Sequence, residues 1–166
     1  NFVVGPLLNP ARPTAQLIGV PRADLTEPMA QVLQSLGIAR GMVICGRAGD
    51  RPMDELSILG ENTISEYYQA NGFSTATLDP AELDLADATL EDLAGGDAAE
   101  NAEIIRAILT GTEHGPKREA VLLNAGAALF VAGQAEAIRT GMERAAAVID
   151  DGRAGAKLDA LATRYA

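Results

Sequence analysis

The chain has 166 residues, of which 48% are hydrophobic and only 4% are aromatic, with no Trp. This length suits one globular domain, and Ala, Leu, Ile and Val side chains must build its core. The formal net charge of −10 and the scatter of the 13 basic residues argue against nucleic-acid binding, which needs a basic patch. Cys45 is the only cysteine, so no internal disulfide can form. No apolar run is long enough to cross a bilayer, and we expect a soluble, cytoplasmic protein without membrane contact.

The first half of the chain has the pattern of a βαβ unit. Residues 16–20 are a short apolar run between two prolines, which is typical of a strand. Residues 24–27 have the pattern of a capping box, and they predict a helix that ends at Gly37. Residues 41–46 read as a buried strand, which implies parallel pairing of the two strands and a right-handed crossover. One face of the helix should be apolar, with Leu25, Met29, Val32, Leu33 and Leu36.

The next segments predict a loop, a hairpin and then only helices. Residues 47–61 form a turn-rich loop after the second strand, where open parallel sheets bind their ligands. Residues 63–69 and 73–78 can pair as a hairpin around Asn71-Gly72. The expected helices are 97–110, with a capping box at Asp97–Glu100, 116–132, which should be central and buried, 134–150 and 153–164. The whole chain therefore reads as one α/β unit with a helical C-terminal half.

The adjacent carboxylates of Asp54 and Glu55 are the best candidates for chemistry. In a loop beyond a parallel strand, both can reach a hard cation such as Mg²⁺, which prefers oxygen ligands and keeps several waters. The cation would neutralise a diphosphate. A solvated acidic turn would have the same sequence, and the nearby Arg47, Asp50 and Arg51 do not decide between the two interpretations.

The segment Gly5-Pro6-Leu7-Leu8-Asn9-Pro10 is rigid and rich in turn residues. Its prolines fix φ, and Gly5 permits close approach of the backbone, so the segment can form a wall for a planar aromatic substrate. A plain connector between strands would look similar. Residues 1–4 begin without Met and read as the middle of a buried strand, so we expect that further chain precedes them.

The other polar candidates have structural explanations. Gly95-Gly96-Asp97 could be a phosphate-binding loop, but Asp97 would repel an anion, and ordinary helix capping explains it better. His114 lies in a polar loop and should be exposed, and the sequence shows no nucleophile that it could serve. Cys45 should be a small core residue, and Asn124 should bond a neighbouring backbone group rather than line a cleft.

Lys117 and Arg118 fall in the first turn of an expected helix, where positive charge opposes the helix dipole. A partner carboxylate or a bound phosphate would explain them, and so would simple exposure to solvent.

Four segments together resemble the anthranilate phosphoribosyltransferase family from end to end of the chain. Residues 1–13 are similar to its Phe-Asn-x-x-Gly-Pro-Leu-x-Asn-Pro-Ala-Arg-Pro stretch, and residues 54–57 to its Asp-Glu-Ile/Leu-Ser metal motif. Residues 95–102 and 117–125 resemble two further family blocks. The order and spacing of the four segments carry the resemblance.

The resemblance implies transfer of a phosphoribosyl group from phosphoribosyl diphosphate to the amino group of anthranilate, a step of tryptophan biosynthesis. Asp54 and Glu55 would hold Mg²⁺ at the diphosphate, Gly5 and Pro6 would line the anthranilate side, and no covalent nucleophile is expected. The implied fold is the C-terminal domain type of nucleoside phosphorylases and phosphoribosyltransferases, a parallel or mixed sheet flanked by helices.

Several family features are absent from these 166 residues. The Gly-Thr-Gly-Gly-Asp diphosphate loop, the Lys-His-Gly-Asn stretch, the anthranilate-binding Arg and the small helical domain through which members dimerise all lie upstream in the family. We therefore expect residues 1–166 to be one domain of a longer homodimeric protein and to be inactive alone.

Two alternatives remain open at this point. A pyrimidine nucleoside phosphorylase would use the same fold with phosphate as the acceptor, although Gly5–Pro10 and Asp54-Glu55 favour anthranilate. A non-catalytic relative that binds nucleic acid is disfavoured by the net charge of −10.

Overall fold

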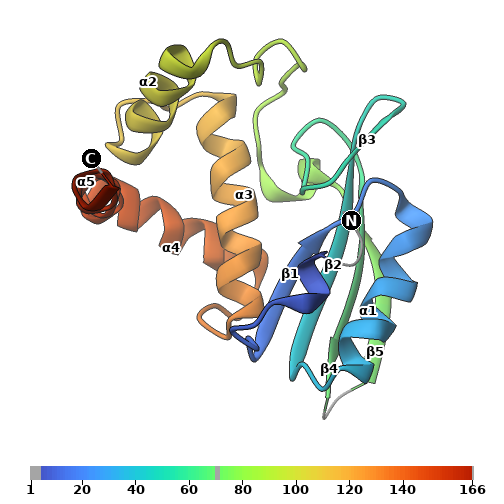
Figure 1. The fold of residues 1–166 in the computed structure, drawn as a ribbon. Helices are drawn as coiled ribbons and strands as arrows, with labels where there is room; N and C mark the ends of the chain where they lie inside the picture. The colour runs from blue at the N-terminus through green and yellow to red at the C-terminus, as the bar shows by residue number, and fades with distance from the viewer. Residues whose placement is uncertain (1–4, 70–71, 166) are drawn as a thin grey trace.

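The computed structural model describes residues 5–69 and 72–165, which form a mixed sheet followed by a group of helices (Figure 1). The strands and the long helices alternate only at the start of the chain. The elements are η1 Gly5–Leu8, β1 Ala15–Gly19, η2 Ala23–Leu25, α1 Thr26–Ser35, β2 Arg40–Ala48, β3 Arg51–Met53, β4 Asn62–Tyr68, β5 Gly72–Leu78, η3 Pro80–Leu83, α2 Ala98–Leu109, α3 Pro116–Val131, α4 Ile138–Asp150 and α5 Arg153–Tyr165.

The sheet has the order β1-β2-β4-β5, and β3 pairs with β2 beyond the reach of β4. β1 and β2 are parallel, with Ile18 opposite Val43, which confirms the predicted βαβ unit. The other pairs are antiparallel, and β4 and β5 form the expected hairpin, whose turn residue Asn71 lies outside the described residues. The sheet is therefore mixed and flanked by helices, as predicted. Residues 1–4, for which we predicted a strand, also lie outside the described residues.

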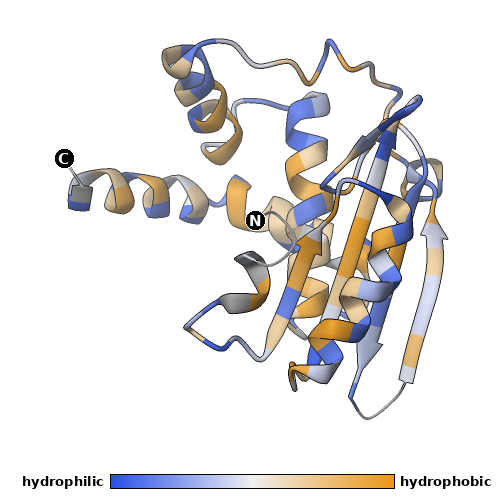
Figure 2. Ribbon diagram, turned by 45° about the vertical axis from the view of Figure 1, so that its right-hand side comes forward, coloured by the Kyte–Doolittle hydropathy of each residue, from blue (hydrophilic) through white to orange (hydrophobic). Residues whose placement is uncertain are grey.

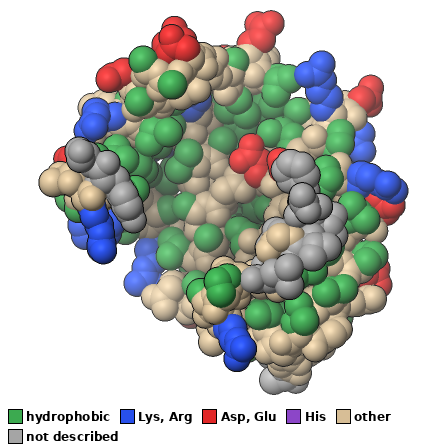
Figure 3. All heavy atoms as spheres, in the orientation of Figure 1, with side chains coloured by type: hydrophobic (Ala, Val, Ile, Leu, Met, Phe, Trp, Pro, Cys, Tyr) green, Lys and Arg blue, Asp and Glu red, His purple; other side chains and the backbone are tan. Residues whose placement is uncertain are grey.

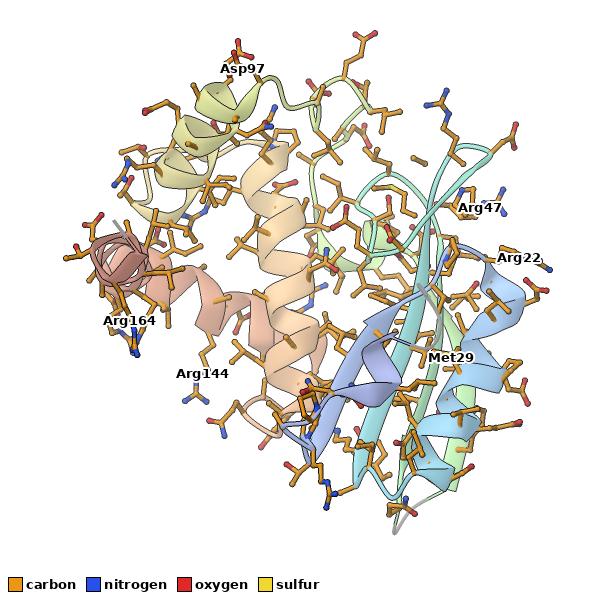
Figure 4. All side chains as sticks on the ribbon, in the orientation of Figure 1. Arg22, Met29, Arg47, Asp97, Arg144 and Arg164 are labelled. Atoms are coloured by element: carbon orange, nitrogen blue, oxygen red, sulfur yellow. The ribbon has the colours of Figure 1, made fainter. Side chains whose placement is uncertain are left out.

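Strand β2 holds the core together because its side chains alternate between two apolar clusters. Val43 and Cys45 face α1 and join the first cluster. Met42 and Ile44 face α3 and join the second, together with Leu56, Leu123 and others. Met29, labelled in Figure 4, reaches from α1 to the sheet, and Figure 2 shows the hydrophobic stretch along the middle strands. The sheet is thus covered on both faces.

The start of α1 differs from the prediction. No capping box forms at residues 24–27, because the Asp24 carboxylate pairs with the Arg22 guanidinium at 2.5 Å instead of capping the helix. A short 3-10 turn precedes α1, and the Thr26 hydroxyl donates a hydrogen bond to the Ala23 carbonyl at 2.9 Å. Gly37, with φ of +80°, ends the helix as expected.

The predicted apolar face of α1 is only partly correct. Met29 and Leu33 are buried, and so is Ala30, whereas Val32 is 40% exposed and Leu36 is 57% exposed. The buried stripe of α1 is therefore narrower than the hydrophobic pattern of its sequence.

The helical half is built around α3. This helix packs its Leu123, Ala127 and Val131 face against the sheet, while Ala128 on its other side is exposed, so it is central but not buried all round. Helix α4 begins at Ile138, four residues later than predicted. Figures 1 and 2 show α5 standing out from the sheet at the far end of α4. Within the described ranges, no helix is both long and apolar enough to span a membrane.

Candidate functional site

The Asp54-Glu55 pair lies in the loop that follows β3, at the end of the sheet where β1 and β2 finish. Antiparallel pairing puts Met53 opposite Gly46, so the pair comes directly beside the carboxyl end of β2. The side chains of Asp54 and Glu55 are exposed, whereas residues 56–58 are buried. Residues 56–58 therefore anchor the loop, and Asp54 and Glu55 before them expose their carboxylates.

Two strand glycines let this loop lie directly on the sheet. A Cβ atom on Gly19 would collide with the carbonyl oxygen of Asp54, and one on Gly46 would collide with that of Glu55. Neither glycine has a positive φ, so the need is for space rather than for an unusual backbone conformation. The two glycines thus let the backbone of Asp54 and Glu55 lie in contact with the strands.

Asn124 of α3 holds the same loop from the other side. Its Oδ1 accepts a hydrogen bond from the Leu56 amide at 2.9 Å, and its Nδ2 donates to the Leu56 carbonyl at 2.8 Å and to the Ala120 carbonyl at 3.0 Å. This confirms the prediction that Asn124 bonds a neighbouring backbone group. The peptide next to Glu55 is therefore tied to a central helix.

A second asparagine, Asn62, closes the loop at its far end, and sequence reasoning missed it. Its Oδ1 accepts from the Ser57 amide at 2.6 Å, and its Nδ2 donates to the carbonyls of Ser57 at 2.9 Å and Gly60 at 3.2 Å. Asn62 is fully buried, so these bonds replace water at a backbone that no strand pairs. A lone Asn before an expected strand gave no signal of this role.

The two carboxylates are not neutralised by the rest of the described chain. Between residues 5 and 69 and between 72 and 165, neither Asp54 nor Glu55 accepts a hydrogen bond or forms an ion pair through its side chain. Burial by the surrounding protein raises the pKa of Glu55, and the Asp54 charge adds to this. A cation held by both residues would relieve the repulsion.

The two carboxylates of Asp54 and Glu55 suit magnesium better than a metal ion that needs three or more protein ligands. The described part of the chain holds no group of three or more His, Cys, Asp or Glu side chains suited to a metal ion. Mg²⁺ is commonly bound through one or two carboxylates and completes its shell with waters and substrate phosphates. Asp54 and Glu55, with their oxygens free, match that requirement.

The Gly5–Leu8 segment forms a 3-10 turn, in keeping with its turn-rich sequence. Gly5 is exposed with open space around it, and Leu7 anchors the turn to the cluster on the α1 face. The side chain of Pro6 lies outside the described residues. No described contact joins Gly5 to Asp54 or Glu55, and the role of Gly5 and Pro6 in substrate binding stays a prediction.

Gly95-Gly96-Asp97 serves the helix, as the sequence favoured. Asp97 accepts hydrogen bonds from the amides of Ala99 and Glu100, both at 2.9 Å, and the Glu100 carboxylate accepts from the Asp97 amide at 2.8 Å. The Gly96 amide is also occupied, by the Asn101 side chain at 3.0 Å. Figure 4 shows Asp97 at the tip of α2, pointing outward. The amides of Gly96 and Asp97 thus bond side chains of the helix that they precede.

The basic pair at the start of α3 has partners within the chain. The Lys117 ammonium donates to the Asp92 carbonyl at 2.6 Å. Arg118 is only 7% exposed and pairs with Asp150 of α4 at 2.8 Å, so a partner carboxylate, one of the three explanations that the sequence left open, is the one found for Arg118. His114 is exposed and Cys45 is buried, both as predicted, and burial raises the pKa of the Cys45 thiol.

A groove leads from Glu55 to the helical half. Glu55 and Lys117 line it, and its walls are apolar; its volume is about 340 Å³, with Leu93, Ile104, Ile105, Ile108 and Ala120 among its lining residues. Figure 3 shows the molecule hollowed between its helical part and its sheet, with hydrophobic side chains along the hollow and acidic ones beside it. Acidic and apolar surfaces therefore meet at the same place.

The mixed sheet, the helices on both of its faces and a carboxylate pair beside the carboxyl end of β2 define an α/β domain with a candidate ligand site. A family model described as "Glycosyl transferase family, a/b domain" matches residues 1–155, and the chain belongs to this family. Among its curated relatives, the anthranilate phosphoribosyltransferase of Syntrophotalea carbinolica is 45% identical over 159 residues, and that of Alkaliphilus metalliredigens is 46% identical over 160. The alignments cover 96% of this chain but only 44% and 45% of these relatives, so the chain spans less than half their length.

Solved structures agree with this placement. The anthranilate phosphoribosyltransferase of Thermus thermophilus superposes with a TM-score of 0.80 and 39% identity, over 92% of this chain and 43% of that one. The Saccharomyces cerevisiae enzyme in complex with PRPP and Mg has a TM-score of 0.71 at 23% identity, over 86% of this chain and 39% of that one, and shows the same fold. The predicted fold type is therefore confirmed.

Proposed function

We propose that the chain is the α/β part of an anthranilate phosphoribosyltransferase, which joins anthranilate to the ribose phosphate of phosphoribosyl diphosphate. The observation that carries this proposal is the 45% identity to such an enzyme over 96% of the chain, with an Asp54-Glu55 pair free at the end of the sheet. The relatives support this function and not a nucleoside phosphorylase or a nucleic-acid-binding protein.

In this proposal, Asp54 and Glu55 hold Mg²⁺, whose charge neutralises the departing diphosphate. The amino group of anthranilate attacks the anomeric carbon of the ribose, the bond to diphosphate breaks, and the surplus proton of the amine goes to solvent or to a nearby base. The described residues contribute position and charge: Gly19, Gly46 and Asn124 set the loop, and Glu55 lines the groove. Gly5 and Pro6 are proposed to line the acceptor side.

The chain by itself is proposed to be inactive. Its relatives are more than twice as long, and it contains neither a Gly-Thr-Gly-Gly-Asp diphosphate loop nor a Lys-His-Gly-Asn stretch. We propose that the remaining substrate contacts, and the homodimer interface, come from sequence outside these 166 residues.

The test uses the polypeptide extended to the length of its relatives, with Mg²⁺ and phosphoribosyl diphosphate, and follows the loss of anthranilate fluorescence. We expect turnover that falls by at least about 100-fold in the double variant Asp54→Asn/Glu55→Gln, because two charges that bind the metal are lost. Asp50→Asn/Glu61→Gln is the matched control, since it removes two exposed charges of the same region. A folded full-length protein without turnover would refute the assignment.

A further inference from the structure

The loop that carries Asp54 and Glu55 is attached to the fold by more than packing. Leu56, the next residue, is 1% exposed and belongs to the cluster between the sheet and α3. An apolar side chain on α3 would cover this cluster equally well. At that point, however, α3 carries Asn124, one turn before Ala127 and next to Leu123.

Asn124 meets both polar groups of the Leu56 residue. The side-chain amide accepts from its N–H at 2.9 Å and donates to its C=O at 2.8 Å, and the second Nδ2 hydrogen returns to the Ala120 carbonyl at 3.0 Å. The bond to Ala120 fixes the side-chain rotamer. The loop residue beside Glu55 is therefore held in one orientation as well as at one distance.

The opposite side of the loop lies directly against the sheet. The Asp54 carbonyl lies against Gly19 and the Glu55 carbonyl lies against Gly46, where neither glycine leaves room for a Cβ atom. Asp54 and Glu55 thus lie between two strand glycines and one helix asparagine. Adjacent side chains leave the backbone in different directions. Two neighbouring carboxylates can therefore share one hydrated cation only if the backbone between them is held in a suitable conformation.

We propose that Asn124 is a positioning residue that sets the Asp54 and Glu55 carboxylates for a shared divalent cation. The proposal rests on the proposed function, in which these two carboxylates bind Mg²⁺. Under this proposal, the main role of Asn124 is to shape the cation site and not to pack the core. It also predicts that loss of the amide weakens the cation site more than it weakens the fold.

The experiment compares Mn²⁺ binding, by electron paramagnetic resonance of the free ion, in the wild-type protein and in Asn124→Leu, which keeps the volume and removes the three bonds. Gln69→Ala is the matched control: that amide also bonds two carbonyls, those of Gln34 and Ile38, at the opposite end of the sheet. We expect about tenfold weaker Mn²⁺ binding in Asn124→Leu and unchanged binding in Gln69→Ala. Equal affinity in the wild type and Asn124→Leu would overturn the proposal.

A metal-free measurement separates this inference from the proposed function. Amide hydrogen exchange at Leu56 should rise about tenfold in Asn124→Leu relative to the strand amides, because its acceptor is lost. If the wild type binds no Mn²⁺, the metal role of the proposed function fails, and unchanged exchange at residues 54–57 would then overturn the positioning role as well. If Asn124→Leu does not fold, Asn124→Ser, which is small and polar, is measured in its place with the same expected direction.

Discussion

At the residue scale, the carboxylates that are proposed to bind a cation lower the stability of the folded protein when no cation is bound. Asp54 and Glu55 are adjacent, have no cationic partner among the described side chains, and belong to a loop that hydrogen bonds from Asn124 and Asn62 tie to the fold. Burial and the Asp54 charge raise the pKa of Glu55. The folded protein is therefore less stable with Glu55 ionised than with Glu55 protonated.

Replacing Glu55 with Gln should stabilise the metal-free protein at neutral pH. Because folding raises the pKa of Glu55, the folded state favours the protonated side chain. The resulting contribution to the free energy of unfolding is fully present below the ordinary carboxyl range, about pH 4, and is lost as pH rises through the folded-state pKa. The gain at pH 7 should be under about 1 kcal/mol, since solvent screens an exposed carboxylate. Urea denaturation at pH 7 and pH 4 measures it, and the two proteins should converge at the lower pH.

Magnesium should reverse the order of stability of the wild type and Glu55→Gln. Bound cation stabilises only the folded wild type, so millimolar Mg²⁺ should raise the denaturation midpoint of the wild type and leave that of Glu55→Gln unchanged. An equal response of both proteins would show that the cation acts elsewhere.

At the scale of single elements, close approach of backbones decides where glycine is needed. Gly46 ends the buried part of β2 where the loop crosses it, and a Cβ atom there would also lie 2.8 Å from the Ser57 amide nitrogen. Helices α3 and α4 cross in the same manner: a Cβ atom on Gly126 would lie 2.7 Å from the Met142 nitrogen and 2.8 Å from the Ile138 carbonyl oxygen. In both places the neighbour is backbone, which cannot yield as a side chain can.

Gly46→Ala should displace the loop from the sheet. We expect a loss of about 2 kcal/mol in the free energy of unfolding from the overpacked contact, together with weaker Mn²⁺ binding, because Glu55 moves with its carbonyl. Chemical denaturation and the Mn²⁺ titration give the two values. A destabilised variant with unaltered Mn²⁺ affinity would show that the loop can shift without moving the carboxylates.

Gly126→Ala should separate α3 from α4. The helix gains about 1 kcal/mol of propensity, but overpacking against the α4 backbone costs about 1–3 kcal/mol, so the net effect is a loss of up to about 2 kcal/mol. Ala128→Leu, on the exposed side of the same helix, should cost little. Thermal unfolding ranks the two variants, and a stabilised Gly126→Ala would contradict the close crossing.

The elements that the sequence predicts correctly are those specified by neighbours along the chain. Asp97–Glu100 forms the expected capping box, and Pro116 begins α3, because each signal acts within four residues. The capping box at residues 24–27 fails since Arg22 competes for Asp24, and propensity cannot rank two local partners. The contacts that Asn62 and Asn124 make with the loop of the carboxylate pair depend on which segments meet in space, and one sequence does not show that.

At the scale of the whole molecule, the helices are not all packed equally firmly against the core. β2 joins both apolar clusters, so the sheet, α1 and α3 share one core. Helices α2 and α5 contribute no described member to either cluster. Ile108 is the one buried side chain of α2, and the Arg106–Asp159 ion pair at 3.0 Å joins α2 to α5 at the surface. The groove beside Glu55 therefore has one firm wall, α3, and one weakly held wall, α2.

This arrangement predicts two levels of protection in native-state hydrogen exchange. Amides of β2 and α3 should exchange only through global unfolding, whereas those of α2 and α5 should exchange through a local opening of lower free energy. Ile108→Ala should lower that local free energy by about 2 kcal/mol, which is about a 30-fold faster exchange in α2 and α5, and should leave β2 unaffected. Leu123→Ala, within the shared core, should instead accelerate exchange in every element. Uniform protection across the described helices, or a response of β2 to Ile108→Ala, would mean that α2 is part of the main cooperative unit and that both walls of the groove are equally firm.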